Sequence, residues 1–276
     1  MVSIYKRIVE LEEKNEAAVL CTIVRSQGST PRRASSKMLV FPDGRTVGTV
    51  GGGEVEHRVM SEALSALETR RPIYLEYKMA DPSRGDPGLC GGSVEVYVEP
   101  ILPKPVLVVI GGGHVGKALT HLAHWLGFWV AVCDDRAEFC NPQSVPGADA
   151  YYPVPMEALS ANMEITPWTY LVLTTRGVNV DVDGLPGLLD SKAAYIGVIG
   201  SRRRWTTTWK QLVERGIEEE KLRRVYSPIG LELNAETPEE IAVSIMAEII
   251  MLRNGGDGSE MKLKGELRAG TEKPGE

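Results

Sequence analysis

The chain has 276 residues, of which 43% are hydrophobic and 25% charged, an ordinary composition for a globular protein long enough for two compact domains. A formal net charge of -6 leaves no basic surplus to neutralise phosphates, which argues against a nucleic-acid binder. No apolar run approaches the roughly 20 residues that cross a membrane, and the N-terminus lacks the apolar core of a signal peptide. The four cysteines are too scattered for a disulfide framework, so we expect a cytoplasmic protein.

The first hundred residues predict a small α+β domain. Ser3 is placed to cap a first helix, in which Ile4, Ile8 and Leu11 share one apolar face. A turn at residues 42–44 joins two of the expected strands into a hairpin. Strands are expected at residues 17–24, 37–41, 46–50, 73–79 and 93–99.

A glycine run, Gly51-Gly52-Gly53, lies between the hairpin and a helix that carries apolar residues from Val55 to Leu67 on one face. Backbone N–H groups at such a junction can hold an anion, and Arg32 and Arg33 could add positive charge there. Two simpler explanations stay open. Loop arginines are commonly solvated, and a glycine run can serve only a close packing contact.

The stretch from residue 81 to residue 92 contains too much proline and glycine for regular structure. Cys90 lies in this loop before two glycines, and is a candidate nucleophile, soft-metal ligand or sulfur carrier. An inert, partly buried thiol accounts for the same residue equally well. Cys21 differs, because it lies inside an apolar strand and is expected to be a small core residue.

The sequence Pro103-Lys104-Pro105 stiffens the chain and marks a domain boundary. We predict an N-terminal domain of residues 1–102, a linker of residues 103–105 and a second domain of residues 106–253. Residues 254–276 are charged and rich in glycine without apolar periodicity, so we expect a disordered tail.

The second domain begins with a strand, a glycine turn and a helix. Residues 106–110 form an unbroken aliphatic run, as expected of a strand buried on both faces of a parallel sheet. Gly111, Gly113 and Gly116 then satisfy G-x-G-x-x-G, a pattern that permits a tight turn, approach of a pyrophosphate and close helix packing. A helix over residues 117–126 and a strand over residues 128–133 are expected to follow.

Asp134, Asp135 and Arg136 follow that second strand. An acidic residue about twenty positions after the glycines is where such folds hold a ribose hydroxyl. His114 lies inside the glycine loop, where it would neighbour a phosphate. These residues predict a Rossmann-type nucleotide site. The alternative is a βαβ unit with a tight turn and no ligand.

Two more buried strands are predicted at residues 170–174 and 193–199. Residues 175–177 should face the nucleotide crevice, because ligands bind at the carboxyl ends of parallel strands. Ser201 suits the N-cap of a helix that begins with three arginines, of which Arg202 is the first. The positive end of a helix disfavours structural cations, so we expect these arginines to hold an anion.

Thr237, Pro238 and Glu240 form a capping box that begins a last helix, which ends near Asn254. The predicted fold is therefore α/β. It comprises a C-terminal Rossmann-type parallel sheet with helices on both faces and a smaller N-terminal α+β domain.

Several stretches, in order across both halves, resemble the XdhC/CoxI family, the accessory factors of xanthine dehydrogenase and related molybdenum hydroxylases. The resemblance covers residues 15 to 252, and it is specific because so many motifs share one order. Two positions depart from the family pattern: Val178 replaces a histidine after Arg-Gly, and Asn234 replaces a common glycine. The first argues against a proton-transfer role for that loop. The matching motifs are residues 28–33, 48–53, 90–96, 111–116, 134–136, 199–203, 227–231 and 237–242.

The resemblance implies a protein that handles a cofactor rather than one that turns over a metabolite. Such proteins bind the molybdenum cofactor, as molybdopterin or its dinucleotide, support exchange of an oxo ligand for sulfur, and pass the cofactor to the apo-hydroxylase. A cysteine desulfurase supplies the sulfur. The glycine runs and arginines would then hold phosphates, and Cys90 would ligate molybdenum or carry sulfur. We also expect a homodimer.

Two other functions fit the same residues. An NAD(P)-dependent oxidoreductase would use the Rossmann half, with Asp134 and Asp135 favouring NAD and Arg136 tolerating a phosphate. It would also need a catalytic acid or base, for which His114 is the clear candidate near the crevice. A nucleotide sensor would bind without chemistry. We expect no turnover of NADH by the protein alone.

Overall fold

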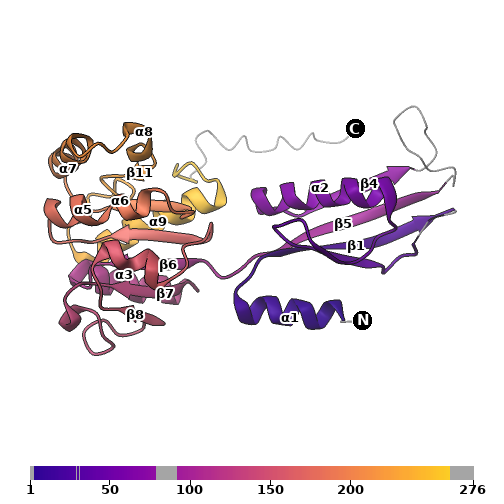
Figure 1. Ribbon diagram of the computed structural model, residues 1–276, viewed down its shortest axis with the longest axis horizontal. Coiled ribbons are helices and arrows are strands. Elements are labelled where there is room, and N and C mark those ends of the chain that lie inside the picture. Colours follow the sequence, from indigo (N-terminus) through magenta and orange to yellow (C-terminus); the bar gives the residue numbers. More distant parts are fainter. Residues whose placement is uncertain (1–2, 29, 31, 79–91, 262–276) are drawn as a thin grey trace, which may run out of the picture. The chain divides into compact units, whose positions relative to one another are not determined.

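The computed structural model divides the chain into two compact units, residues 1–104 and 105–276 (Figure 1). It describes residues 3–28, 30, 32–78 and 92–261. Cys90, and the part of the expected tail from residue 262 onward, therefore lie outside the described residues. The side chain of Asn15 bonds both backbone groups of Lys104, at 2.7 Å and 3.2 Å, which anchors the end of the first unit to the end of its first helix.

The N-terminal unit is an antiparallel sheet of five strands in the order β3-β2-β1-β5-β4, with a helix on each face (Figure 1). The predicted hairpin is confirmed, with Leu39 opposite Val47. β1 continues to Gln27, beyond its predicted end, because it pairs with β5 past a bulge between Ile23 and Arg25. The elements are α1 Ile4–Lys14, β1 Ala18–Gln27, β2 Lys37–Val40, β3 Thr46–Gly48, α2 Gly53–Thr69, β4 Ile73–Lys78 and β5 Ser93–Ile101.

Alternation along the strands gives this sheet two apolar faces. Cys21 and its alternate neighbours on β1 pack with Val96 on β5 under Val59 of α2, so the predicted core position of Cys21 is confirmed. The opposite face packs against Leu11 of α1. Ser3 occupies the predicted N-cap of α1, but its side chain makes no capping hydrogen bond.

The C-terminal unit contains a parallel sheet of six strands in the order β11-β10-β9-β6-β7-β8. Numbered from β6 as the first strand, the order is that of the doubly wound Rossmann fold, with the switch point between β6 and β9. The predicted fold class is thereby confirmed. The strands are β6 Val106–Ile110, β7 Trp129–Cys133, β8 Ala150–Tyr152, β9 Thr169–Leu173, β10 Tyr195–Val198 and β11 Val225–Tyr226.

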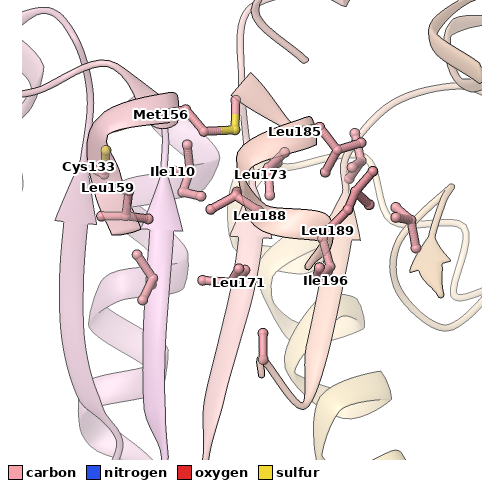
Figure 2. Packing of buried hydrophobic residues seen from close by; sticks show 14 of the residues in the cluster. Ile110, Cys133, Met156, Leu159, Leu171, Leu173, Leu185, Leu188, Leu189 and Ile196 are labelled. Carbon is pink, nitrogen blue, oxygen red and sulfur yellow. The ribbon is translucent and has the colours of Figure 1, made fainter. Parts of the chain in front are cut away.

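Helices cover both faces of this sheet. α3 and α9 pack on the face that carries Leu107 and Val109. Figure 2 shows the opposite face, where Ile110 and Leu171 pack under Met156 and the leucines of the shorter helices. The helices are α3 His114–Trp125, η2 Ala137–Phe139, η3 Met156–Ala158, α4 Leu159–Asn162, α5 Val178–Gly184, α6 Pro186–Leu189, α7 Arg202–Glu214, α8 Glu219–Leu222 and α9 Pro238–Asn254.

Three N-caps were expected from the sequence, at Ser3, Ser201 and Thr237, and the last two make the expected side-chain hydrogen bonds. The Ser201 hydroxyl accepts from the Arg204 N–H, and Thr237 with Glu240 forms the full capping box. α3 begins at His114 rather than Lys117, so the helix starts inside the glycine motif. None of the helices within the described ranges is both long enough and apolar enough to cross a membrane.

Candidate functional site

The glycine turn after β6 is packed tightly everywhere except at Gly113. A Cβ on Gly111 would lie 2.5 Å from the Thr174 carbonyl oxygen, and one on Gly116 would lie 2.1 Å from the Gly111 carbonyl oxygen. Gly112, which the sequence motif does not require, is tightest, since its Cβ would lie 1.8 Å from the Phe139 carbonyl oxygen. Nothing lies within 4 Å of a Cβ on Gly113. The space beside Gly113 is therefore open to a ligand.

Gly113 is also the N-cap of α3, and no side chain caps this helix. The N–H groups of its first turn and the positive end of the helix dipole consequently face that open space, an arrangement suited to an anion such as phosphate. His114 is the first residue of α3 and is exposed, beside this space but not lining the cavity described below.

Asp134 is buried at the end of β7 and its carboxylate is already occupied. One oxygen accepts from the Gly112 N–H at 3.0 Å, and the other accepts from the Arg136 N–H at 3.0 Å. The Arg136 guanidinium bonds both oxygens at 2.9 Å and stacks on the Phe139 ring. Asp134 therefore ties the glycine turn to Arg136, and the more accessible carboxylate of the predicted pair is that of Asp135.

Asp135 and Arg176 form a two-pronged ion pair, with N–O distances of 2.7 Å and 2.9 Å. Asp135 follows β7 and Arg176 follows β9, while β6 lies between these strands, so the pair spans the end of the strand that leads into the glycine turn. The Arg176 guanidinium lowers the pKa of Asp135 to about 2. Of residues 175–177, which were predicted to face a nucleotide crevice, Thr175 and Arg176 line the cavity at these strand ends.

A cavity of about 150 Å³ lies at these strand ends, and we call it the strand-end cavity. Its apolar lining includes Ile110, Val154, Met156 and Val180. Figure 2 shows Ile110, Cys133 and Met156 gathered at this end of the strands. Its charged lining comprises Asp134, Asp135, Arg136, Glu157, Arg176 and Asp183.

A buried network behind the cavity holds the segment that carries Arg176. Asp181, fully buried on α5, accepts from the Thr175 hydroxyl and from Arg204 of α7 at 2.7 Å and 3.1 Å. Arg204 also donates to the Thr175 carbonyl at 3.1 Å. The expectation of an anion-holding arginine is therefore wrong for Arg204, because Asp181 already occupies its guanidinium. Arg202 is exposed, and its side chain bonds no described residue.

Two of the three N–H groups of the second glycine run, those of Gly51 and Gly52, are already bonded, which favours the simpler explanations of this run. The Glu56 carboxylate accepts from the Val50 N–H at 3.3 Å, from the Gly52 N–H at 3.0 Å and from the Thr49 hydroxyl. Gly51 donates to the Thr49 hydroxyl at 3.1 Å, while Gly53 begins α2. The positive end of α2 thus attracts a carboxylate of its own first turns. The sequence did contain a signal for this internal contact, because an acidic residue, Glu56, closely follows the glycine run.

Arg32 and Arg33 are both exposed, and neither side chain bonds a residue of this glycine run among the parts of the chain that the structure describes. Their placement leaves the simpler explanation, solvated loop arginines, as good as the anion-binding one.

The three cysteines that the structure describes are buried and poorly nucleophilic. Burial raises the pKa of Cys21 and of Cys133 to about 12, and it also raises the pKa of Cys140. A thiol with such a pKa supplies almost no thiolate at neutral pH. Residues 3–28, 30, 32–78 and 92–261 also contain no group of three or more metal-binding side chains. Cys90, the predicted nucleophile and metal ligand, lies outside those ranges.

Replacing Arg176 by glutamine is expected to separate binding from stability. The pair with Asp135 is about half exposed, so its loss should cost less than about 1 kcal/mol of unfolding free energy. Losing the guanidinium should weaken a phosphate-bearing ligand about tenfold while a nucleoside without phosphate is unaffected. Calorimetry with both ligands checks this. Asp135→Asn is the control, since it removes the same ion pair but keeps the guanidinium, and equal losses in both variants would contradict a phosphate role.

Comparison with known proteins places both units in one family. The description "XdhC Rossmann domain" matches residues 107–249, and "XdhC and CoxI family" matches residues 11–78. The chain is 38% identical over 263 residues to the uncharacterised protein YqeB of Escherichia coli (strain K12), covering 94% of this chain and 48% of that protein. The chain thus spans about half the length of that relative.

Two further relatives have names that state a role. A probable xanthine dehydrogenase subunit of Bacillus subtilis (strain 168) is 26% identical over 321 residues, covering 88% of this chain and 95% of that protein. The molybdenum cofactor insertion chaperone PaoD of Escherichia coli (strain K12) is 25% identical over 280 residues, covering 91% of this chain and 88% of that protein.

Proposed function

We propose, since the chain belongs to the XdhC and CoxI family, that it is an accessory protein for maturation of a xanthine dehydrogenase-type molybdenum hydroxylase. In this role it binds the molybdenum cofactor and inserts it into the apo-hydroxylase. The name of the relative PaoD, a molybdenum cofactor insertion chaperone, supports the insertion step. The cofactor is cargo, which the protein must hold firmly enough to protect and release to its partner.

The observation that carries this proposal is the open, uncapped end of α3 beside the strand-end cavity. The cofactor is an anionic pterin phosphate, so it needs a phosphate site next to a site for a flat ring. The first turn of α3 and the open space at Gly113 suit the phosphate. Arg176 can supply a further charge-assisted hydrogen bond, and the cavity provides apolar walls for a ring.

Sulfuration is the finer part of the proposal. We propose that a cysteine desulfurase delivers sulfur while the cofactor is bound, and that Cys90 provides the thiolate that contacts molybdenum or carries the sulfur. The raised pKa values of Cys21, Cys133 and Cys140 support this assignment by making those three thiols poor nucleophiles. Cytoplasmic location and a homodimer belong to the same proposal.

Cys90→Ala is expected to fold normally but to lose most of its ability to activate the partner. The measurement is reconstitution of an apo-hydroxylase with cofactor carried by each variant, scored as hydroxylase activity and as molybdenum retained. Cys21→Ala is the control. It removes a buried sulfur, so it should lower the unfolding free energy by about 1 kcal/mol and leave activation unchanged. If Cys90→Ala activates as well as the unmodified protein, the thiol has no part in cofactor handling.

The same geometry gives an NAD(P)-dependent oxidoreductase less support. His114 was its candidate acid or base, and that side chain is exposed at the start of α3 without lining the strand-end cavity. The carboxylates of Asp134 and Asp135 are held by arginines. Steady oxidation of NADH by the purified protein with a small carbonyl compound would nevertheless establish that function in place of ours.

A further inference from the structure

The carboxylates of the strand-end cavity are not equivalent. Three of the four are each bonded to an arginine: Asp134 to Arg136, Asp135 to Arg176, and Asp183 to Arg215. The fourth, Glu157, makes no hydrogen bond or ion pair with any residue that the structure describes. An ionised carboxylate can only accept hydrogen bonds, so Glu157 leaves two acceptor oxygens available to a ligand.

The backbone of Glu157 is fixed although its side chain has no partner. Glu157 is the middle residue of η3. Met156 before it and Leu159 after it are both buried in the core, and Met156 packs against Gly184. Glu157 therefore lines the cavity from a short helix that core residues hold on both sides.

A ring also needs an apolar surface to lie against. The side chains of Ile110, Val154, Met156 and Val180 provide this surface in the cavity. The volume of about 150 Å³ is below the roughly 300–1,000 Å³ of pockets that enclose a drug-sized molecule. It suits one flat ring system rather than a whole dinucleotide. The phosphate of such a ligand would extend toward Arg176 and the first turn of α3.

We propose that the strand-end cavity binds a 2-amino-4-oxopyrimidine ring, the edge shared by guanine and pterins, and that Glu157 recognises its two neighbouring N–H donors. Two donors side by side match the two oxygens of one carboxylate, as in other paired hydrogen bonds. Adenine and cytosine each offer an amino group next to a ring acceptor, which a carboxylate repels. This inference rests on the proposed function and extends it by naming the ring edge and the residue that selects it.

The test compares ligands that differ only by the 2-amino group. Guanosine 5′-monophosphate should bind the unmodified protein about tenfold more tightly than inosine 5′-monophosphate, and pterin should bind more tightly than pteridin-4(3H)-one by a similar factor. In Glu157→Gln both ratios should fall to near one. Calorimetry gives the affinities, and the thermal midpoint of Glu157→Gln should be unchanged because the side chain is exposed and unpaired.

Asp183→Asn is the matched control, because Asp183 lines the same cavity but is neutralised by Arg215, so both ratios should survive. Selectivity in the guanine arm alone or in the pterin arm alone supports the proposal and identifies the source of the ring. Ratios near one in the unmodified protein, or ratios that persist in Glu157→Gln, would overturn it. Cofactor insertion into the apo-hydroxylase is scored separately, so this inference can fail while the proposed function stands.

Discussion

Arg204→Met is expected to destabilise the C-terminal unit by about 3–5 kcal/mol, because it leaves the Asp181 carboxylate buried without its cation. Asp181 is fully buried and Arg204 is 21% exposed in its side chain, so water cannot replace the lost partner without rearrangement. Urea unfolding followed by circular dichroism measures the loss. Arg202→Met is the control on the same helix, since Arg202 is exposed and its side chain bonds no described residue.

The pH dependence tests the cause. Burial raises the pKa of Asp181 above its ordinary value, and removing Arg204 should raise it further. A carboxyl whose pKa is higher in the folded state contributes stability at low pH and loses it as pH rises through the folded value. The deficit of Arg204→Met should therefore shrink as pH falls from 7 toward 4. A deficit that is independent of pH, or one that Asp181→Leu does not partly restore, would contradict the buried-charge explanation.

This network shows why the site could be predicted only in part. Arg202, Arg203 and Arg204 are indistinguishable as a run of sequence, and the rule about cations at a helix start applies to all three. Only Arg204 reaches Asp181, which lies 23 residues earlier on another helix. Pairing across such a distance depends on how α5 and α7 pack, and no local pattern contains that information.

The fold was more predictable than the site because its signals are local. The aliphatic run of β6, the glycines and the helix that follows are adjacent in sequence, and they specify the first βαβ unit. β8 and β11 were not predicted because a strand of three residues, or of two, has no measurable alternation. Their positions come from pairing with β7 and β10, which is again information from tertiary structure.

The predicted site residues show the same division. Gly111 and Gly116 have the steric reasons that the motif implies, and Asp135 lies at the expected strand end. The motif does not mention Gly112, whose constraint is the Phe139 carbonyl, and it could not reveal that Glu56 occupies the second glycine run. Contacts made by a neighbouring loop or by a later turn of the same helix lie outside what a motif describes.

Gly113→Val is expected to weaken a phosphate-bearing ligand by about 100-fold, the equivalent of two lost hydrogen bonds to a charged group. A Cβ on Gly113 would meet no protein atom within 4 Å, and the residue has an extended backbone with φ of -71°, so we expect the folded protein to accommodate valine. The same side chain would fill the open space beside the first turn of α3, where the phosphate has to lie. Calorimetry with ATP, CTP, NAD and NADP measures the loss.

Gly112→Ala is the contrasting variant at the neighbouring residue, because it should lower stability, whereas Gly113→Val should lower ligand affinity. Its Cβ would lie 1.8 Å from the Phe139 carbonyl oxygen, so even one methyl group should lower the free energy of unfolding by at least about 1–3 kcal/mol. Gly113→Val should lose less than about 1 kcal/mol, mainly through a poorer N-cap. A Gly113→Val protein that is stable but does not bind identifies Gly113 as the position kept small for the ligand. If that variant binds as well as the unmodified protein, the phosphate does not lie beside Gly113, and the uncapped end of α3 is not its site.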